Sequence, residues 1–140
     1  MLLVSIFIVI ISGVLYHFCQ KTISPDAHPL VSLIITYTTA IVLSLAAFFF
    51  FPLKHGIVDS LKQAGWATYL LGIAIFGLEA GYLLAYRAGA DLSSTAIYTN
   101  AAVAIMLIPI GMFIFREHLS AARMAGIVLC IVGFLLISRK

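Results

Sequence analysis

Five long, nearly uncharged stretches constrain this chain more than any other feature of its sequence. The stretches 1–20, 30–52 and 94–115 carry no formal charge, and 66–86 and 119–138 carry one each. A helix rises about 1.5 Å per residue, so roughly 20 residues cover the hydrocarbon core of a bilayer, about 30 Å thick. We therefore predict that each stretch is a membrane-spanning helix.

The composition excludes several classes of protein. Hydrophobic residues make up 64% of the chain and charged residues 9%, whereas soluble domains carry roughly 25% charged residues. The basic residues are scattered singly, which argues against nucleic-acid binding. The sequence also lacks a Gly-rich phosphate loop, paired metal ligands and a nucleophile beside a base. We thus expect neither an enzyme nor a bound metal or cofactor.

The connections between the stretches are short. The longest polar one, 54–63, has room for a short interfacial helix, and Ser93 or Ser94 is placed to cap the helix that follows the third connection. No connection can hold a separate soluble domain. We predict an all-α, five-span membrane domain over residues 1–140, located in the inner (plasma) membrane as a multi-pass protein.

The basic residues divide evenly between the two faces of such a protein. Five spans place the termini on opposite sides, and each side then receives four basic residues: Lys54, Lys62, Arg116 and Arg123 on one, and Lys21, Arg87, Arg139 and Lys140 on the other. Membrane orientation follows the Lys/Arg bias of the loops, so an even division favours neither orientation. Our hypothesis is dual topology with an antiparallel homodimer; the alternative is that a single end loop decides the orientation.

Small residues recur along the last stretch and offer a contact surface. They are Ala122, Gly126, Cys130 and Gly133. Small side chains allow two helices to approach closely, either between two chains or within one. An antiparallel pair would resemble the inverted repeats of secondary transporters, whose substrate site lies near the membrane midplane between the repeats.

Glu79 is the most informative polar residue, because a charged side chain at the bilayer centre costs about 2.5–3.5 kcal/mol. It should face protein or a water-filled cavity. Helical periodicity places Gly72, Tyr82 and Tyr86 on the same face. We predict that Glu79 exchanges protons or binds substrate and that the phenols hold an ammonium group by cation–π attraction. The alternative is a structural hydrogen bond or ion pair.

Other polar residues extend this candidate site. Tyr98 and Asn100 lie in the first turns of 94–115, and Tyr37 lies in 30–52 among threonines that we expect to bond to their own helix carbonyls. His17 is either a proton relay or an interfacial residue. Pro109 removes one backbone hydrogen bond from its helix, so it is a candidate hinge or a simple kink.

Several motifs between residues 82 and 137 resemble the second half of an EamA repeat of the drug/metabolite transporter superfamily. They are the Tyr-Arg-Ala-Gly-Ala turn at 86–90, Pro109 in the fourth span, Arg116-Glu117-His118-Leu119 after it, and the glycines Gly126 and Gly133. Usual members fuse two repeats into ten spans, whereas this chain has one. The resemblance therefore implies a half-size protein, similar to the dual-topology dimers of the small multidrug resistance branch, that pairs with itself or with a paralogous half-size chain.

Together these features predict a secondary active transporter, a proton-coupled exporter of a small metabolite, amino acid or organic cation, with its site between two protomers. Two other functions remain open. One is a lipid-carrier flippase component, whose phosphate substrate would require cationic groups such as Arg87 and Arg123. The other is a non-transporting membrane subunit of a larger complex.

Overall fold

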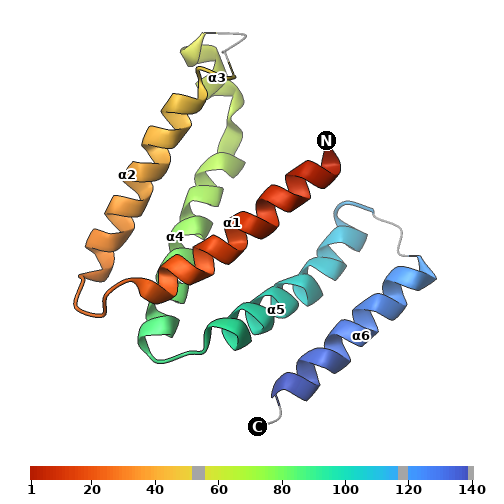
Figure 1. Ribbon diagram of the computed structural model, residues 1–140. Helices are drawn as coiled ribbons and strands as arrows, with labels where there is room; N and C mark the ends of the chain where they lie inside the picture. Colours follow the sequence, from red (N-terminus) through yellow and green to blue (C-terminus); the bar gives the residue numbers. More distant parts are fainter. Residues whose placement is uncertain (52–55, 117–119, 139–140) are drawn as a thin grey trace. The chain divides into compact units, whose positions relative to one another are not determined.

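The computed structural model describes residues 1–51, 56–116 and 120–138, and within these ranges the chain is helical with no strand (Figure 1). This confirms the predicted all-α class. The helices are α1 (Leu2–Thr22), α2 (Pro29–Ala47), α3 (Ile57–Gln63), α4 (Gly65–Arg87), α5 (Leu92–Phe113) and α6 (Ala121–Ser138). The short α3 lies within the polar connection 54–63.

Four of the described helices, α1, α2, α4 and α5, are long and apolar enough to cross a membrane. They correspond to four of the five predicted spans. The fifth predicted span, 119–138, coincides with α6, which has 18 residues and several side chains outside the described part of the structure. A fifth crossing therefore stays a prediction.

Two helix boundaries differ from the prediction. The stretch 30–52 was expected to be helical throughout, but α2 ends at Ala47 and the next four residues, all phenylalanine, form a turn. The amides of Phe48, Phe49 and Phe50 bond to carbonyls three residues back, at 3.2, 3.1 and 3.0 Å. Hydropathy does not distinguish an apolar helix from an apolar turn, and a residue followed by proline, here Phe51, disfavours the helical conformation.

The predicted capping of the fourth span by Ser93 or Ser94 is wrong. Helix α5 begins earlier, at Leu92, so both serines lie inside its first turn. Asp91 occupies the N-cap position but makes no side-chain capping hydrogen bond. The backbone of Asp91 is extended (φ −72°, ψ 138°), as an N-cap residue requires, so the helix begins one residue before the first serine.

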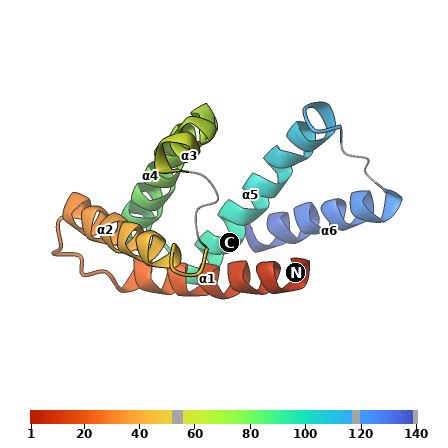
Figure 2. The same ribbon diagram turned by 90° about the horizontal axis from the view of Figure 1, so that it is seen from above.

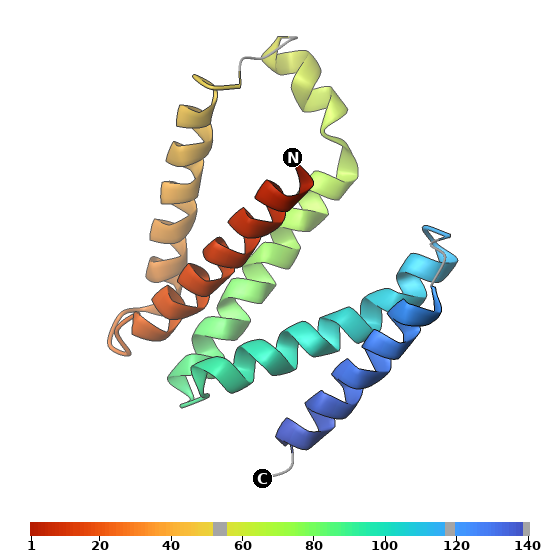
Figure 3. The same ribbon diagram turned by 45° about the vertical axis from the view of Figure 1, so that its right-hand side comes forward.

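The chain divides into two compact units, Met1–Gly89 and Ala90–Lys140. In the first, α4 packs against both α1 and α2, and Figure 2 shows these three long helices from above. Among the described residues of this unit, those that are buried are Gln20, Leu33, Glu79, Leu83 and Tyr86. In the second, α5 and α6 lie side by side and run in opposite directions (Figure 3).

The C-terminal end of α4 is tied to the loop between α1 and α2. The Arg87 guanidinium donates hydrogen bonds from Nη2 to the carbonyls of Ser24 (3.2 Å) and Ala27 (2.5 Å). Two residues later the chain turns at Gly89, whose φ of +93° suits glycine because a side chain rarely adopts it. Arg87 therefore holds the α1–α2 loop against the end of α4.

The outer faces of the helices are strongly apolar. Leu3, Ile34 and Leu71 are 81%, 63% and 59% exposed, and most large apolar side chains of α1 and α2 are exposed as well. Apolar surface on this scale requires an apolar surrounding. Lipid tails supply that surrounding, so the polar side chains buried among these helices are the ones that call for a separate explanation.

Candidate functional site

Glu79 lies inside α4 and is only 9% exposed. Its Oε2 atom is buried and has no hydrogen-bond partner within the described residues. Burying a carboxylate oxygen without a partner costs free energy, because the oxygen loses its hydrogen bonds to water and forms none with the protein. Glu79 is therefore an acceptor that a proton or a ligand can satisfy.

The face of α4 that carries Glu79 is the one that the sequence periodicity predicted. Glu79, Leu83 and Tyr86 are the buried residues of α4, and Tyr82 beside them is half-buried. The rings of Tyr82 and Tyr86 are stacked, with centroids 6.0 Å apart and planes 20° apart. Residues three, four and seven positions apart share one side of a helix, which accounts for this alignment.

Helix α1 completes this face with two aromatic side chains. His17 Nδ1 lies 3.0 Å from the Tyr86 hydroxyl, in a hydrogen bond whose donor depends on the imidazole tautomer. The ring of His17 meets that of Tyr82 edge-on at 4.8 Å, and the ring of Tyr16 does so at 5.7 Å. We call Tyr16, His17, Tyr82 and Tyr86 the aromatic cluster.

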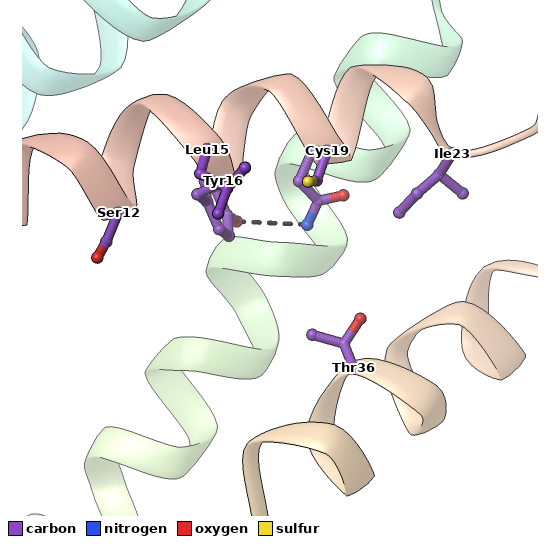
Figure 4. Close-up of a pocket in the computed structure, with 7 residues that line it drawn as sticks. Ser12, Leu15, Tyr16, Cys19, Ile23 and Thr36 are labelled. Carbon is purple, nitrogen blue, oxygen red and sulfur yellow. Dashed lines mark hydrogen bonds between the residues drawn. The ribbon is translucent and has the colours of Figure 1, made fainter. Parts of the chain in front are cut away.

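Gln20 lies next to the aromatic cluster, one turn beyond Tyr16, and is 6% exposed. Its Nε2 donates a long hydrogen bond of 3.5 Å to the Tyr16 hydroxyl, while its Oε1 is buried without a partner in the described structure. Gln20 and Tyr16 also line a cavity of about 250 Å³ between α1 and α2 (Figure 4). The other lining residues are Ser12, Leu15, Cys19, Ile23 and Thr36.

Helix α2 contributes Tyr37, whose hydroxyl is buried and has no partner among the described residues. Within the described residues, four buried side-chain atoms have no hydrogen-bond partner: Gln20 Oε1 on α1, Tyr37 Oη on α2, and Glu79 Oε2 and Arg87 Nε on α4.

A positive charge of the chain itself already lies against the aromatic cluster. The Lys21 ammonium nitrogen is 5.6 Å from the centroid of the Tyr86 ring. This distance is within the range of cation–π attraction. The ring face of Tyr86 therefore lies beside an ammonium group of the chain itself, and the binding of a substrate cation by Tyr82 and Tyr86 stays a prediction.

The structure brings together five of the seven predicted substrate or proton residues in the unit Met1–Gly89, namely His17, Tyr37, Glu79, Tyr82 and Tyr86. The remaining two, Tyr98 and Asn100, lie on α5 in the other unit, half-buried and exposed respectively. Their part in a site stays a prediction, as does a hinge at Pro109, which lies inside α5.

The threonines of α2 behave as predicted. Thr36, Thr38 and Thr39 each donate to the carbonyl four residues earlier in the same helix, at 3.0, 2.7 and 2.9 Å. These hydroxyls are satisfied within α2. Of the polar residues in this part of the helix, Tyr37 alone has a buried oxygen without a described partner.

The small residues of α6 leave open space beside the helix. A Cβ added at Gly126 or Gly133 would meet no described atom within 4 Å, and Ala122 and Cys130 are exposed. Close packing against another helix at this stripe is not present within the described residues. A contact there with a second chain stays a prediction.

Gln20 and Tyr16 are the site residues that the prediction omitted. Gln20 was treated only as the end of an uncharged stretch, because an amide carries no formal charge. The available signal was their spacing: two hydrogen-bonding side chains four residues apart share one face of an apolar helix. Within the described residues, no group of three or more His, Cys, Asp or Glu side chains could hold a metal ion.

Comparison with known proteins agrees with the arrangement of apolar helices around buried polar groups. No curated protein and no solved structure matches the chain. The family profile described as EamA-like transporter family matches residues 1–139, nearly the whole chain and not only the segment from 82 to 137 that carried the resemblance. The chain belongs to the EamA-like transporter family, a family of membrane transporters.

Proposed function

We propose that the chain is a half-size secondary active transporter in which Glu79 binds a proton and a small substrate in turn. The substrate is a metabolite, an amino acid or an organic cation, and the proton gradient drives its export across the inner (plasma) membrane. The observation that carries the proposal is the buried Oε2 of Glu79, which has no partner among the described residues.

The chemistry follows from competition for one carboxylate. A proton neutralises Glu79, and a bound cation balances the charge of the ionised carboxylate without a proton. Because the two cannot occupy the carboxylate together, arrival of one releases the other. Release on opposite sides of the membrane would couple the two fluxes, provided that the site opens to one side at a time.

A second protomer belongs to the same proposal. One EamA repeat supplies one half of an inverted pair, and a second copy in the opposite orientation, or a paralogous half-size chain, would supply the other. The small residues Gly126 and Gly133 of α6 have open space beside them among the described atoms and are available for such a contact. The substrate site would then lie near the midplane between the protomers.

The test is proton flux in proteoliposomes that contain the purified protein and an internal pH-sensitive dye. Gradients of alanine, methylammonium and guanidinium serve as probes. We expect at least one gradient to move protons, and Glu79→Gln to abolish this movement because an amide cannot exchange a proton. The matched control is Asp59→Asn, which removes an exposed carboxylate from α3 and should preserve the flux. Unchanged flux in Glu79→Gln would reject the mechanism.

The two other functions predict different results. A lipid-carrier flippase component would use Arg87 and Arg123 to hold phosphate, but the guanidinium of Arg87 is bonded to two loop carbonyls. The side chain of Arg123 lies outside the described residues. A non-transporting subunit would move protons with none of the probes and would copurify with an unrelated protein.

A further inference from the structure

We infer that the substrate of this site is a small cation with several N–H groups, such as a guanidinium or a primary ammonium ion, and that Gln20 selects it. The inference rests on the proposed function of Glu79 and adds the substrate class. It also assigns a specificity-determining role to a residue that the sequence did not single out. Its basis is the set of unpartnered atoms and the cavity beside them.

Three of the four buried side-chain atoms without a described partner can accept a hydrogen bond, and the fourth, Arg87 Nε at the end of α4, is a donor. Gln20 Oε1 can only accept a hydrogen bond, and so can an ionised Glu79 Oε2, while the Tyr37 hydroxyl can accept or donate. The Nε2 of Gln20 donates to the Tyr16 hydroxyl at 3.5 Å, which leaves Oε1 as the amide atom without a partner in the described structure. A ligand that satisfies all three atoms must therefore bring more than one donor.

The geometry links these acceptors through Tyr16. Its hydroxyl receives the hydrogen bond from Gln20, and its ring meets that of Tyr82 at 5.7 Å. Tyr82 in turn lies three residues from Glu79, on the same side of α4. Gln20 on α1 is thus linked through Tyr16 and Tyr82 to the side of α4 that carries Glu79.

The surroundings favour a positive charge on that ligand. Glu79 supplies the opposite charge, and the phenol rings supply negatively polarised faces. The position of Lys21, 5.6 Å from the Tyr86 ring centroid, shows that an ammonium group is accommodated at this cluster. An anionic ligand would instead face a carboxylate in an apolar environment.

The cavity gives such a ligand access to Gln20. It has a volume of about 250 Å³ and is lined by Gln20 and Tyr16 together with mainly apolar groups. Ligand sites of this kind combine apolar walls with a few polar atoms that fix orientation. A quaternary ammonium ion would fill the same space and carry the same charge, but it has no N–H to give, so Gln20 Oε1 would stay unpartnered.

The experiment compares three probes on the purified, unaltered protein by titration calorimetry in detergent. The probes are guanidinium, methylammonium and tetramethylammonium chloride. A buried acceptor left unpaired weakens binding by about tenfold for each hydrogen bond lost. We therefore expect guanidinium and methylammonium to bind, and tetramethylammonium to bind at least about tenfold more weakly than guanidinium.

A variant then tests Gln20 itself. Gln20→Met keeps the length of the side chain and removes the amide oxygen, so guanidinium affinity should fall about tenfold while tetramethylammonium affinity stays the same. The matched control is Thr38→Val, which removes a hydroxyl from α2 outside the cavity, one already bonded to the Ile34 carbonyl at 2.7 Å. It should change neither affinity. If Gln20→Met does not fold, judged by size-exclusion chromatography and circular dichroism, the order of the three probes still decides.

The outcomes separate this inference from the proposed function. Equal binding of tetramethylammonium and guanidinium, or unchanged guanidinium affinity in Gln20→Met, rejects the substrate class even when Glu79→Gln abolishes binding. Binding of none of the probes also rejects it, and the proposed function is then judged by the flux assay alone. Cation binding that persists in Glu79→Gln rejects the role of Glu79.

Discussion

The hydrogen bond between His17 and Tyr86 joins two helices through a pair of side chains that the sequence separates by 69 positions. Tyr86 is 5% exposed, so the hydroxyl has exchanged water for one imidazole nitrogen. A bond in this setting contributes about 1 kcal/mol net to stability, and it leaves a costly unpaired group when one partner is removed. It is therefore the single contact between α1 and α4 that is easiest to test.

We predict that Tyr86→Phe lowers the free energy of unfolding by about 1 kcal/mol, because it deletes the hydroxyl and keeps the ring. The measurement is unfolding of the purified protein by sodium dodecyl sulfate titrated into detergent micelles, followed by circular dichroism. Tyr69→Phe removes a hydroxyl from the same helix at a side chain that is 71% exposed, and it should leave stability nearly unchanged. Equal effects of the two variants would contradict a structural role for the bond.

At the scale of the elements, the end of α4 and the loop before α2 behave as one piece because Arg87 bonds to the carbonyls of Ser24 and Ala27. A charged donor to a backbone carbonyl contributes about 1.5–3 kcal/mol when it is shielded from water. Arg87 is half-buried, so the lower part of that range applies.

We predict that Arg87→Met loosens this loop and lowers the free energy of unfolding by about 1.5 kcal/mol. Hydrogen exchange measured by mass spectrometry should show faster exchange at residues 23–28 and little change in the interior of α2. Lys62→Met is the control, since it also removes one basic residue from a helix but at the polar helix α3. Loop exchange that is the same in Arg87→Met and in the unaltered protein would show that the two bonds do not hold the loop.

The sequence predicted the positions of these helices as far as hydropathy and charge determine them. Lack of charge marked the positions of α1, α2, α4 and α5, and the one carboxylate in an apolar helix marked Glu79. The same signal overextended α2 into Phe48–Phe51, because an aromatic turn is as apolar as a helix. The presence of each helix could be predicted from composition, whereas the residue at which it ends could not.

The site shows a similar limit. Helical periodicity within one segment placed Glu79, Tyr82 and Tyr86 on a common face, which the structure confirms. Periodicity does not say which helices pack together, so the contacts of Tyr16, His17 and Gln20 with that face could not be derived. A single sequence gives no information about the distance between α1 and α4.

At the scale of the whole molecule, the even distribution of basic residues leads to a prediction about orientation. With reporters that are active only in the cytoplasm or only outside it fused to the C-terminus, we expect comparable activity from both, because neither face is favoured by its Lys/Arg content. Activity from one reporter alone would reject the antiparallel homodimer and point to an oppositely oriented paralogous chain.

Two charge variants provide the control for this experiment. Lys62→Gln leaves three basic residues on the N-terminal face against four, so it should raise the activity of the cytoplasmic reporter. Lys21→Gln reverses the bias and should raise the activity of the external reporter. If both variants leave the ratio of the reporters unchanged, the distribution of charge does not set the orientation.

The hydroxyl groups of α2 that bond within their own helix affect how that helix can move. Because Thr36, Thr38, Thr39 and Ser44 each bond within their own helix, apolar contacts hold this stretch of α2 on α4. Sliding or rolling of α2 would break none of these bonds. The loop that precedes α2 is anchored by Arg87, whereas its other end leads into a phenylalanine turn. Helix α2 can therefore pivot about its anchored N-terminal end near Pro29 and slide along α4 without losing a hydrogen bond of these hydroxyls.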